Sequence, residues 1–266
     1  MREKCAIIGY YCINNEEKCV PDCINSLEKL QHRGRESSGI SYLNNNNEWG
    51  LFRGVGLVKD VYSNYKFNEP VKSIIGHNRY STSGKGKPQV VMEYNDDMEC
   101  IEDKNCTMQI QPFYDSSFNF SFVHNGNIQG VDYENNDSFD LFNKIIECLD
   151  SGLDMKSILI NILQTKKGIY NLIVQTPDGL YLVKDRFGVR PFFYGYKSDN
   201  VIICGSETVA AGDTIGYIEA GGVVIAEPAQ EAADEIEILE CKKTNKELFY
   251  RFIRYQAKKN KKKVIV

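Results

Sequence analysis

The alternation of hydrophobic and polar positions predicts helices in two parts of the chain, among many short strands. An apolar run at Cys5–Gly9 predicts a buried strand almost at the start of the sequence. Apolar residues at helical spacing follow over 20–30. Two more helices are expected over 137–149, where Asp137-Ser138 is a good N-cap, and over 155–163.

Most other segments are predicted to be short strands; 118–122 alternates as a half-buried strand does, 73–75 is expected to be buried, and 51–59 is a bent strand or a loop. They lie at 40–43, 51–59, 73–75, 118–122, 169–175, 180–184, 192–196, 201–205, 222–226 and 236–240. Asn125-Gly126 between alternating residues is typical of a hairpin turn. The aromatic segment 247–255 favours a helix, and lysines follow it. Helices clustered among antiparallel strands predict a layered α+β domain rather than a βαβ-wound one.

Composition narrows the range of functions without choosing one. The chain has 266 residues, is 42% hydrophobic and carries a formal net charge of -4, which gives no reason to expect a nucleic-acid partner. No apolar run approaches the ~20 residues of a membrane helix. The 9 cysteines form no CxxC pair, so neither a disulfide framework nor a metal site is expected. A reducing cytoplasm is therefore the predicted location.

Three places along the chain carry candidate chemistry. Cys5 is more simply explained by packing, but removal of residues 1–4 would leave it with a thiol beside a free α-amine, a nucleophile with its own base. Arg79, at the end of a buried strand, needs an internal carboxylate or a substrate carboxylate as its partner. Asn125, with a neighbouring backbone N–H, has the groups of an oxyanion hole, although a hairpin turn explains the pair equally well.

Five tracts in order resemble the glutaminase domain of the amidophosphoribosyltransferase family, class II glutamine amidotransferases of the N-terminal nucleophile (Ntn) hydrolase superfamily. These tracts are Cys5–Gly9, Leu30–Ile40, Gly76–Thr82, Gln111–Phe113 with His124–Asn127, and Lys184–Pro191, while 205–210 agrees more loosely. The resemblance covers about 5–255 and implies an α+β fold, a four-layer αββα sandwich with two antiparallel sheets between helical layers.

The resemblance also divides the chain. It implies a propeptide at 1–4 that is removed, an amidotransferase domain at 5–240 with an insertion loop at 84–109, and a helical, basic C-terminal tail at 241–266. The family's phosphoribosyltransferase domain is not expected in this chain. No cofactor and no metal are expected, because the other ligands of an iron–sulfur cluster near Cys241 would belong to that second domain.

Roles for individual residues follow from the same resemblance. Cys5 matches the nucleophile, and Asn125 with the N–H of Gly126 matches the oxyanion hole. Arg79 matches the residue that binds the α-carboxylate of glutamine, and Asp137 the acid that receives its α-amine. Asp140, one helical turn away, remains a competitor for that last role. His77 and Thr82, from the tract of Arg79, are expected beside the substrate.

The implied protein is a cytoplasmic glutaminase of purine biosynthesis that takes glutamine as substrate and supplies ammonia to a separate synthase subunit. Neither a membrane nor a nucleic acid is an expected partner, and a homo-oligomer is compatible with the sequence. One alternative is a non-catalytic relic or regulatory binding domain that retains residues 1–4. A weaker alternative is a relative that acts on another amide, or one that serves a different acceptor such as a sugar phosphate.

Overall fold

A computed structural model describes most of the chain. The described residues are 5–14, 16–67, 69–80, 110–129, 136–210, 213–226, 235–244, 247–256 and 264–265. The expected propeptide at 1–4, Thr82 and the insertion loop at 84–109 lie outside them.

One antiparallel sheet has β1 at its centre, because this strand pairs with β10 on one side and β4 on the other. The strand order is β11-β9-β10-β1-β4-β2-β3. The strands are β1 (Ala6–Cys12), β2 (Ser37–Asn44), β3 (Trp49–Val55), β4 (Val71–Arg79), β9 (Phe193–Ser198), β10 (Val201–Gly205) and β11 (Asp213–Tyr217). The same part of the molecule carries α1 (Cys19–Lys29), α2 (Val58–Val61) and the 3₁₀ helix η1 (Thr208–Ala210).

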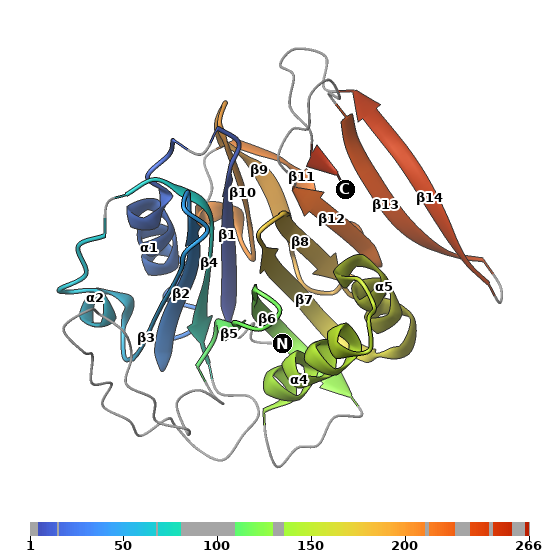
Figure 1. The fold of residues 1–266 in the computed structure, drawn as a ribbon, viewed down its shortest axis with the longest axis horizontal. Coiled ribbons are helices and arrows are strands. Elements are labelled where there is room, and N and C mark those ends of the chain that lie inside the picture. Colours follow the sequence, from blue (N-terminus) through green and yellow to red (C-terminus); the bar gives the residue numbers. More distant parts are fainter. Residues whose placement is uncertain are drawn as a thin grey trace.

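The second antiparallel sheet runs in the order β14-β13-β12-β8-β7-β6-β5, with β15 paired to β12. Its strands are β5 (Phe113–Asp115), β6 (Phe120–Gln129), β7 (Lys167–Thr176), β8 (Gly179–Lys184), β12 (Gly222–Ala226), β13 (Glu235–Thr244), β14 (Glu247–Gln256) and β15 (Val264–Ile265). Helices α4 (Asp137–Asp150) and α5 (Met155–Thr165) cover its outer face (Figure 1).

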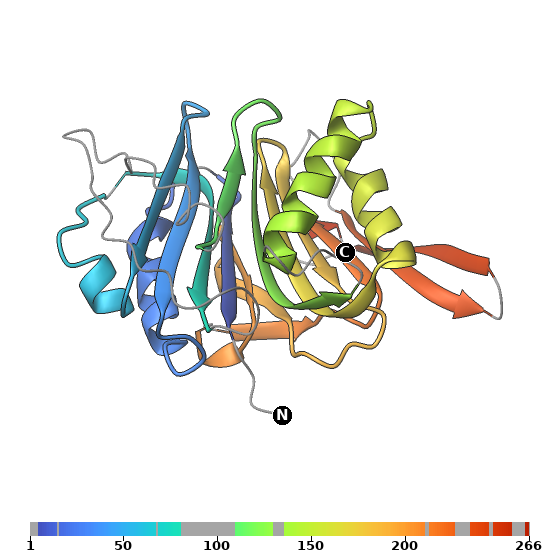
Figure 2. The same cartoon turned by 90° about the horizontal axis from the view of Figure 1, so that it is seen from below.

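Three hydrophobic clusters separate four layers, as the period-2 alternation of the strands requires. In β1, Ile8 and Tyr10 belong to the cluster that packs against α1, whereas Ile7 and Tyr11 belong to the cluster between the sheets. The third cluster joins the second sheet to α4 and α5. Figure 2 shows the helices outside the two sheets. The expected four-layer αββα sandwich is therefore confirmed.

Two local predictions are wrong. The segment expected as a helix over 247–255 is strand β14, paired with β13 along its length. Its aromatic and β-branched side chains suit a strand better than a helix. Asn125-Gly126 is not a hairpin turn, because β6 continues through it in register with β7, opposite Asn171 and Tyr170.

The start of α4 is also shifted by one position. Asn136, rather than Asp137, is the N-cap, and its side chain accepts a hydrogen bond from the N–H of Ser138. Because Asn136 performs the capping, the Asp137 carboxylate is available for other contacts.

Candidate active site

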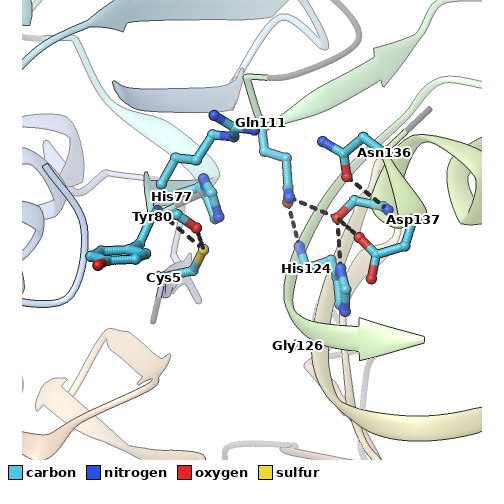
Figure 3. Close-up of a pocket in the computed structure, with 10 residues that line it drawn as sticks. Cys5, His77, Tyr80, Gln111, His124, Gly126, Asn136 and Asp137 are labelled. Carbon is cyan, nitrogen blue, oxygen red and sulfur yellow. Dashed lines mark hydrogen bonds between the residues drawn. The ribbon is translucent and has the colours of Figure 1, made fainter. Parts of the chain in front are cut away.

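A pocket opens where β1 begins, β4 ends and α4 begins. Antiparallel pairing of Ala6 with Asn78 brings Cys5 beside Tyr80. About 290 Å³ of space lies among the pocket's lining residues, part of it open to solvent. It is lined by Cys5, His77, Arg79, Tyr80, Gln111, His124, Gly126, Asn136, Asp137 and Ser138. Figure 3 shows Cys5 and Tyr80 on one side and His124, Asn136 and Asp137 on the other.

The Cys5 thiol is held by the backbone of Tyr80. Its Sγ lies 3.2 Å from the Tyr80 carbonyl oxygen and accepts from the Tyr80 N–H at 3.3 Å. Burial raises the pKa of the thiol above its ordinary value, while the Tyr80 backbone hydrogen bond and the charges of Arg79 and Arg190 act in the opposite direction. Nearby cations therefore partly offset the cost of forming a thiolate in this half-buried position.

Arg79 is the last residue of β4 and is 4% exposed. Its Nη1 donates to Glu36 Oε2 at 3.1 Å. Of the two partners expected from the sequence, an internal carboxylate or a substrate carboxylate, the internal one is therefore present. A guanidinium presents five N–H donors in a planar fork, and the contact with Glu36 fixes one part of that fork. The side chain also lines the pocket, where its charge faces the interior.

Asp137 lies on the opposite side of the pocket. Its Oδ2 accepts a hydrogen bond from the Ile128 N–H at 3.1 Å, which anchors the carboxylate to β6. Asp140, the competing acid, does not line the pocket. The position of the pocket therefore favours Asp137 for contact with a bound molecule.

His77 lines the pocket with two buried ring nitrogens. Within the part of the chain that the structure describes, neither nitrogen has a hydrogen-bond partner. Burial, with smaller effects from the charges of Arg79 and His124, lowers the pKa of His77 to about 3. The imidazole is therefore neutral at physiological pH, and a bound polar molecule could supply the missing hydrogen bonds.

A polar network that the sequence did not predict supports the Asp137 side of the pocket. His124 Nδ1 lies 2.6 Å from Ser138 Oγ, and the His124 N–H donates to Gln111 Oε1 at 2.5 Å. Gln111 Nε2 completes the network by donating to Ser138 Oγ at 3.1 Å. Gln111 and His124 stand in a tract that carried the resemblance, which was the available signal for their importance.

The two expected oxyanion-hole residues occupy different positions. Gly126 lines the pocket, and a Cβ there would lie 2.3 Å from the Ile169 carbonyl oxygen, so the strands pack too closely for a side chain. Asn125 is completely buried and does not line the pocket. The site thus brings together Cys5, His77, Arg79, Gly126 and Asp137, with Asn125 adjacent in the chain.

Other kinds of site find little support within the described residues. There, no group of three or more His, Cys, Asp or Glu side chains could hold a metal ion. Six cysteines are free thiols: Cys5, Cys12, Cys19, Cys23, Cys148 and Cys204. No described helix combines the length and apolar character needed to cross a membrane.

Comparison with known proteins supports the interpretation of the sequence. Residues 100–212 match a family model described as a glutamine amidotransferase domain. The chain is 31% identical over 229 residues to the chloroplastic amidophosphoribosyltransferase of Vigna aconitifolia, covering 79% of this chain and 41% of the relative. It is also 31% identical over 233 residues to the amidophosphoribosyltransferase of Methanothermobacter thermautotrophicus, covering 81% and 44%.

A solved structure shares the fold. Glutamine phosphoribosylpyrophosphate amidotransferase from B. subtilis superimposes with a TM-score of 0.61 at 22% identity, covering 84% of this chain and 47% of that one. The chain thus spans less than half the length of these relatives. The family-model match at 100–212 includes the last two of the five sequence tracts, and the relatives confirm the resemblance.

Proposed function

We propose that this chain, which carries a class II glutamine amidotransferase domain related to that of the amidophosphoribosyltransferases, hydrolyses the side-chain amide of glutamine. Cys5 is the nucleophile once residues 1–4 have been removed. The observation that carries the proposal is the single pocket that contains the Cys5 thiol, the Arg79 guanidinium and the Asp137 carboxylate.

The charges of the pocket suit the backbone end of an amino acid. Arg79 binds the α-carboxylate, a planar anion that matches the guanidinium fork. Asp137 binds the α-ammonium group from the other side of the pocket. His77 offers hydrogen bonds to the polar substrate, and Thr82 is expected beside it from the sequence tract of Arg79.

The reaction is an acyl transfer to sulfur. The free α-amine of Cys5 takes the thiol proton as Sγ attacks the amide carbon, and the C–S bond forms as the carbonyl oxygen becomes an oxyanion. The same amine then returns the proton to the leaving nitrogen, the C–N bond breaks and ammonia departs. Water hydrolyses the thioester, with the amine as base, to release glutamate and restore the thiol.

Two observations on the main chain around Cys5 support this role for the amine. The nitrogen that would become the α-amine donates to the Arg33 carbonyl oxygen at 3.1 Å, which fixes its position. Ala6, the next residue, packs in the cluster against α1, so its methyl group lies away from the pocket.

The oxyanion is stabilised by the Gly126 N–H and the Asn125 side-chain amide. Such donors are most effective when they are fixed before the charge develops, because no reorganisation is then needed. Asn125 is part of a continuous strand, and Gly126 follows it in the tight contact between β6 and β7.

The fate of the ammonia extends the proposal to other proteins. The similarity to amidophosphoribosyltransferases supports a separate synthase subunit of purine biosynthesis as the acceptor of the ammonia. A reducing cytoplasm suits a reactive thiol. Assembly into a homo-oligomer is compatible with this arrangement.

The test compares the 266-residue chain with a chain that begins at Cys5. Intact mass shows whether residues 1–4 are removed, and glutamate release from glutamine measures activity. We expect hydrolysis only with Cys5 at the N-terminus, its loss in Cys5→Ala, and its retention in Cys148→Ala, a free and half-buried thiol outside the pocket. Retention of residues 1–4 without hydrolysis would instead support a non-catalytic binding domain.

A further inference from the structure

We propose that Arg190 and Ser206 are positioning residues that hold the Asn125 amide in the orientation required to bind the oxyanion. The inference rests on the proposed glutaminase function. It assigns roles to two side chains that do not line the pocket and that come from distant parts of the chain.

Arg190 fixes the orientation of the Asn125 side-chain amide by binding its oxygen. It follows β8, and its Nη1 donates to Asn125 Oδ1 at 2.9 Å. A guanidinium can only donate hydrogen bonds, so it can bind the amide oxygen but not the amide NH₂ group. The Asn125 side chain therefore cannot flip without losing a charge-assisted hydrogen bond and placing N–H against N–H.

Ser206 holds the other end of the amide. Asn125 Nδ2 donates to Ser206 Oγ at 3.2 Å, and the same hydroxyl oxygen accepts from the Ile7 N–H at 3.0 Å. The Ser206 N–H in turn donates to the Ile7 carbonyl oxygen at 3.0 Å. One buried serine thus connects the oxyanion-hole side chain to the strand that begins next to the nucleophile.

The geometry of the amide explains what the two contacts achieve. The NH₂ group has two hydrogens, of which Ser206 accepts one, and we assign the second to the oxyanion. Arg190 withdraws electron density from the amide oxygen and so strengthens this donor. Its charge also acts on the Cys5 thiol in the direction that stabilises the thiolate.

The experiment is a double-mutant cycle on glutamine hydrolysis, in chains that begin at Cys5. We expect Arg190→Met to lower kcat at least tenfold, up to the ~10²–10³ that loss of an oxyanion-hole donor costs, with KM nearly unchanged. Arg190→Lys should restore part of the activity, because it keeps a charged donor. Arg186→Met, on the same loop, removes the same charge without a contact to Asn125 and should have little effect.

The cycle separates positioning from general loss of structure. If Arg190 acts through Asn125, Arg190→Met should cost little in an Asn125→Ala background, and Ser206→Ala should behave in the same way. Thermal denaturation identifies variants that have lost activity because they are unfolded. If Arg190→Met is unfolded, the activity of Arg190→Lys is compared with that of the wild type instead.

Two outcomes would overturn the inference in distinguishable ways. If the wild type hydrolyses glutamine but the effects of Arg190→Met and Asn125→Ala multiply independently, Arg190 does not act through the amide and only the inference fails. If a wild-type chain that begins at Cys5 releases no glutamate, the proposed function fails and the inference with it.

Discussion

Arg33 and Cys5 hold each other's main chain in a reciprocal pair of contacts. The Arg33 Nε donates to the Cys5 carbonyl oxygen at 2.8 Å, and the Cys5 N–H donates to the Arg33 carbonyl oxygen at 3.1 Å. The guanidinium is itself paired with Glu207, which also contacts His32 Nε2 at 3.0 Å. The position of Cys5 therefore depends on a carboxylate far away in the sequence.

Glu207→Ala should destabilise the fold, because it leaves the buried Arg33 guanidinium without its carboxylate. Breaking a buried ion pair costs about 3–5 kcal/mol, and since solvent reaches Glu207 we expect about 2–3 kcal/mol. Urea unfolding measures the change. Glu147→Ala removes an exposed ion pair with Lys144 and should cost under about 1 kcal/mol. Equal losses in the two variants would contradict a supporting role for Glu207.

Gly126→Ala should destabilise the second sheet by about 3 kcal/mol, the upper part of the range for overpacking. The new Cβ would lie 2.3 Å from the Ile169 carbonyl oxygen and 2.5 Å from the Tyr170 Cα, and backbone cannot move aside locally. Gly216→Ala is the matched control, because its nearest contact, at 3.1 Å, is the Tyr194 hydroxyl oxygen at the end of a side chain. The free energies of unfolding of the two variants provide the measurement. A Gly126→Ala variant as stable as the wild type would show that the strands can separate.

Asp137→Asn should raise KM for glutamine about 10–100-fold with a smaller effect on kcat. The change keeps an oxygen for the Ile128 N–H but removes the charge that pairs with the α-ammonium group, a hydrogen bond worth about 1.5–3 kcal/mol. Asp140→Asn should leave KM unchanged, because Asp140 does not line the pocket. Steady-state kinetics distinguishes the two acids, and the reverse result would transfer the role to Asp140.

Acid should destabilise the protein through His77. With a folded-state pKa of about 3 and an ordinary value of 6.5, the unfolded chain binds a proton between these values that the folded chain does not. Stability therefore falls with decreasing pH, by about 2 kcal/mol from pH 7 to pH 5 for this group. The pKa of His124 is also lowered by burial and adds in the same direction.

His77→Gln should reduce this pH dependence, because its side chain does not titrate. Unfolding free energies at pH 5 and pH 7 provide the measurement, and the difference between them should shrink by about 2 kcal/mol in the variant. The same pH dependence in the wild type and in His77→Gln would mean that the imidazole is charged, or solvated, in the folded state.

Much of the fold follows from short-range patterns. Strand β1 was predicted from a continuous apolar run, and helix α5 from apolar residues at helical spacing. Such patterns give the wrong element where strand pairing overrides the local signal. At 247–255 aromatic spacing suggested a helix, while the partner strand β13 completes a hairpin. At Asn125-Gly126 a turn signal was overridden by pairing with β7.

The site was partly visible in the sequence for a different reason. The tracts around Cys5, Arg79 and His124 carried the resemblance. They did not identify Glu36 as the carboxylate that pairs with Arg79, or show that the His77 nitrogens have no hydrogen-bond partner among the described residues. Such properties depend on which side chains surround a residue in space. The hydrogen-bond network of Gln111 and Ser138 was not predicted for the same reason.

The order of amino acids alone indicated the layered class, the position of most strands and, through five tracts in order, the family resemblance, since each of these signals lies within short stretches of neighbouring residues. Folding decided the rest. Arg33 meets Glu207 across 174 residues and Asn125 meets Ser206 across 81, because antiparallel register aligns strand ends that are remote along the chain. Long-range pairing of this kind leaves no local signal, and it is what assembles the pocket around the Cys5 thiol.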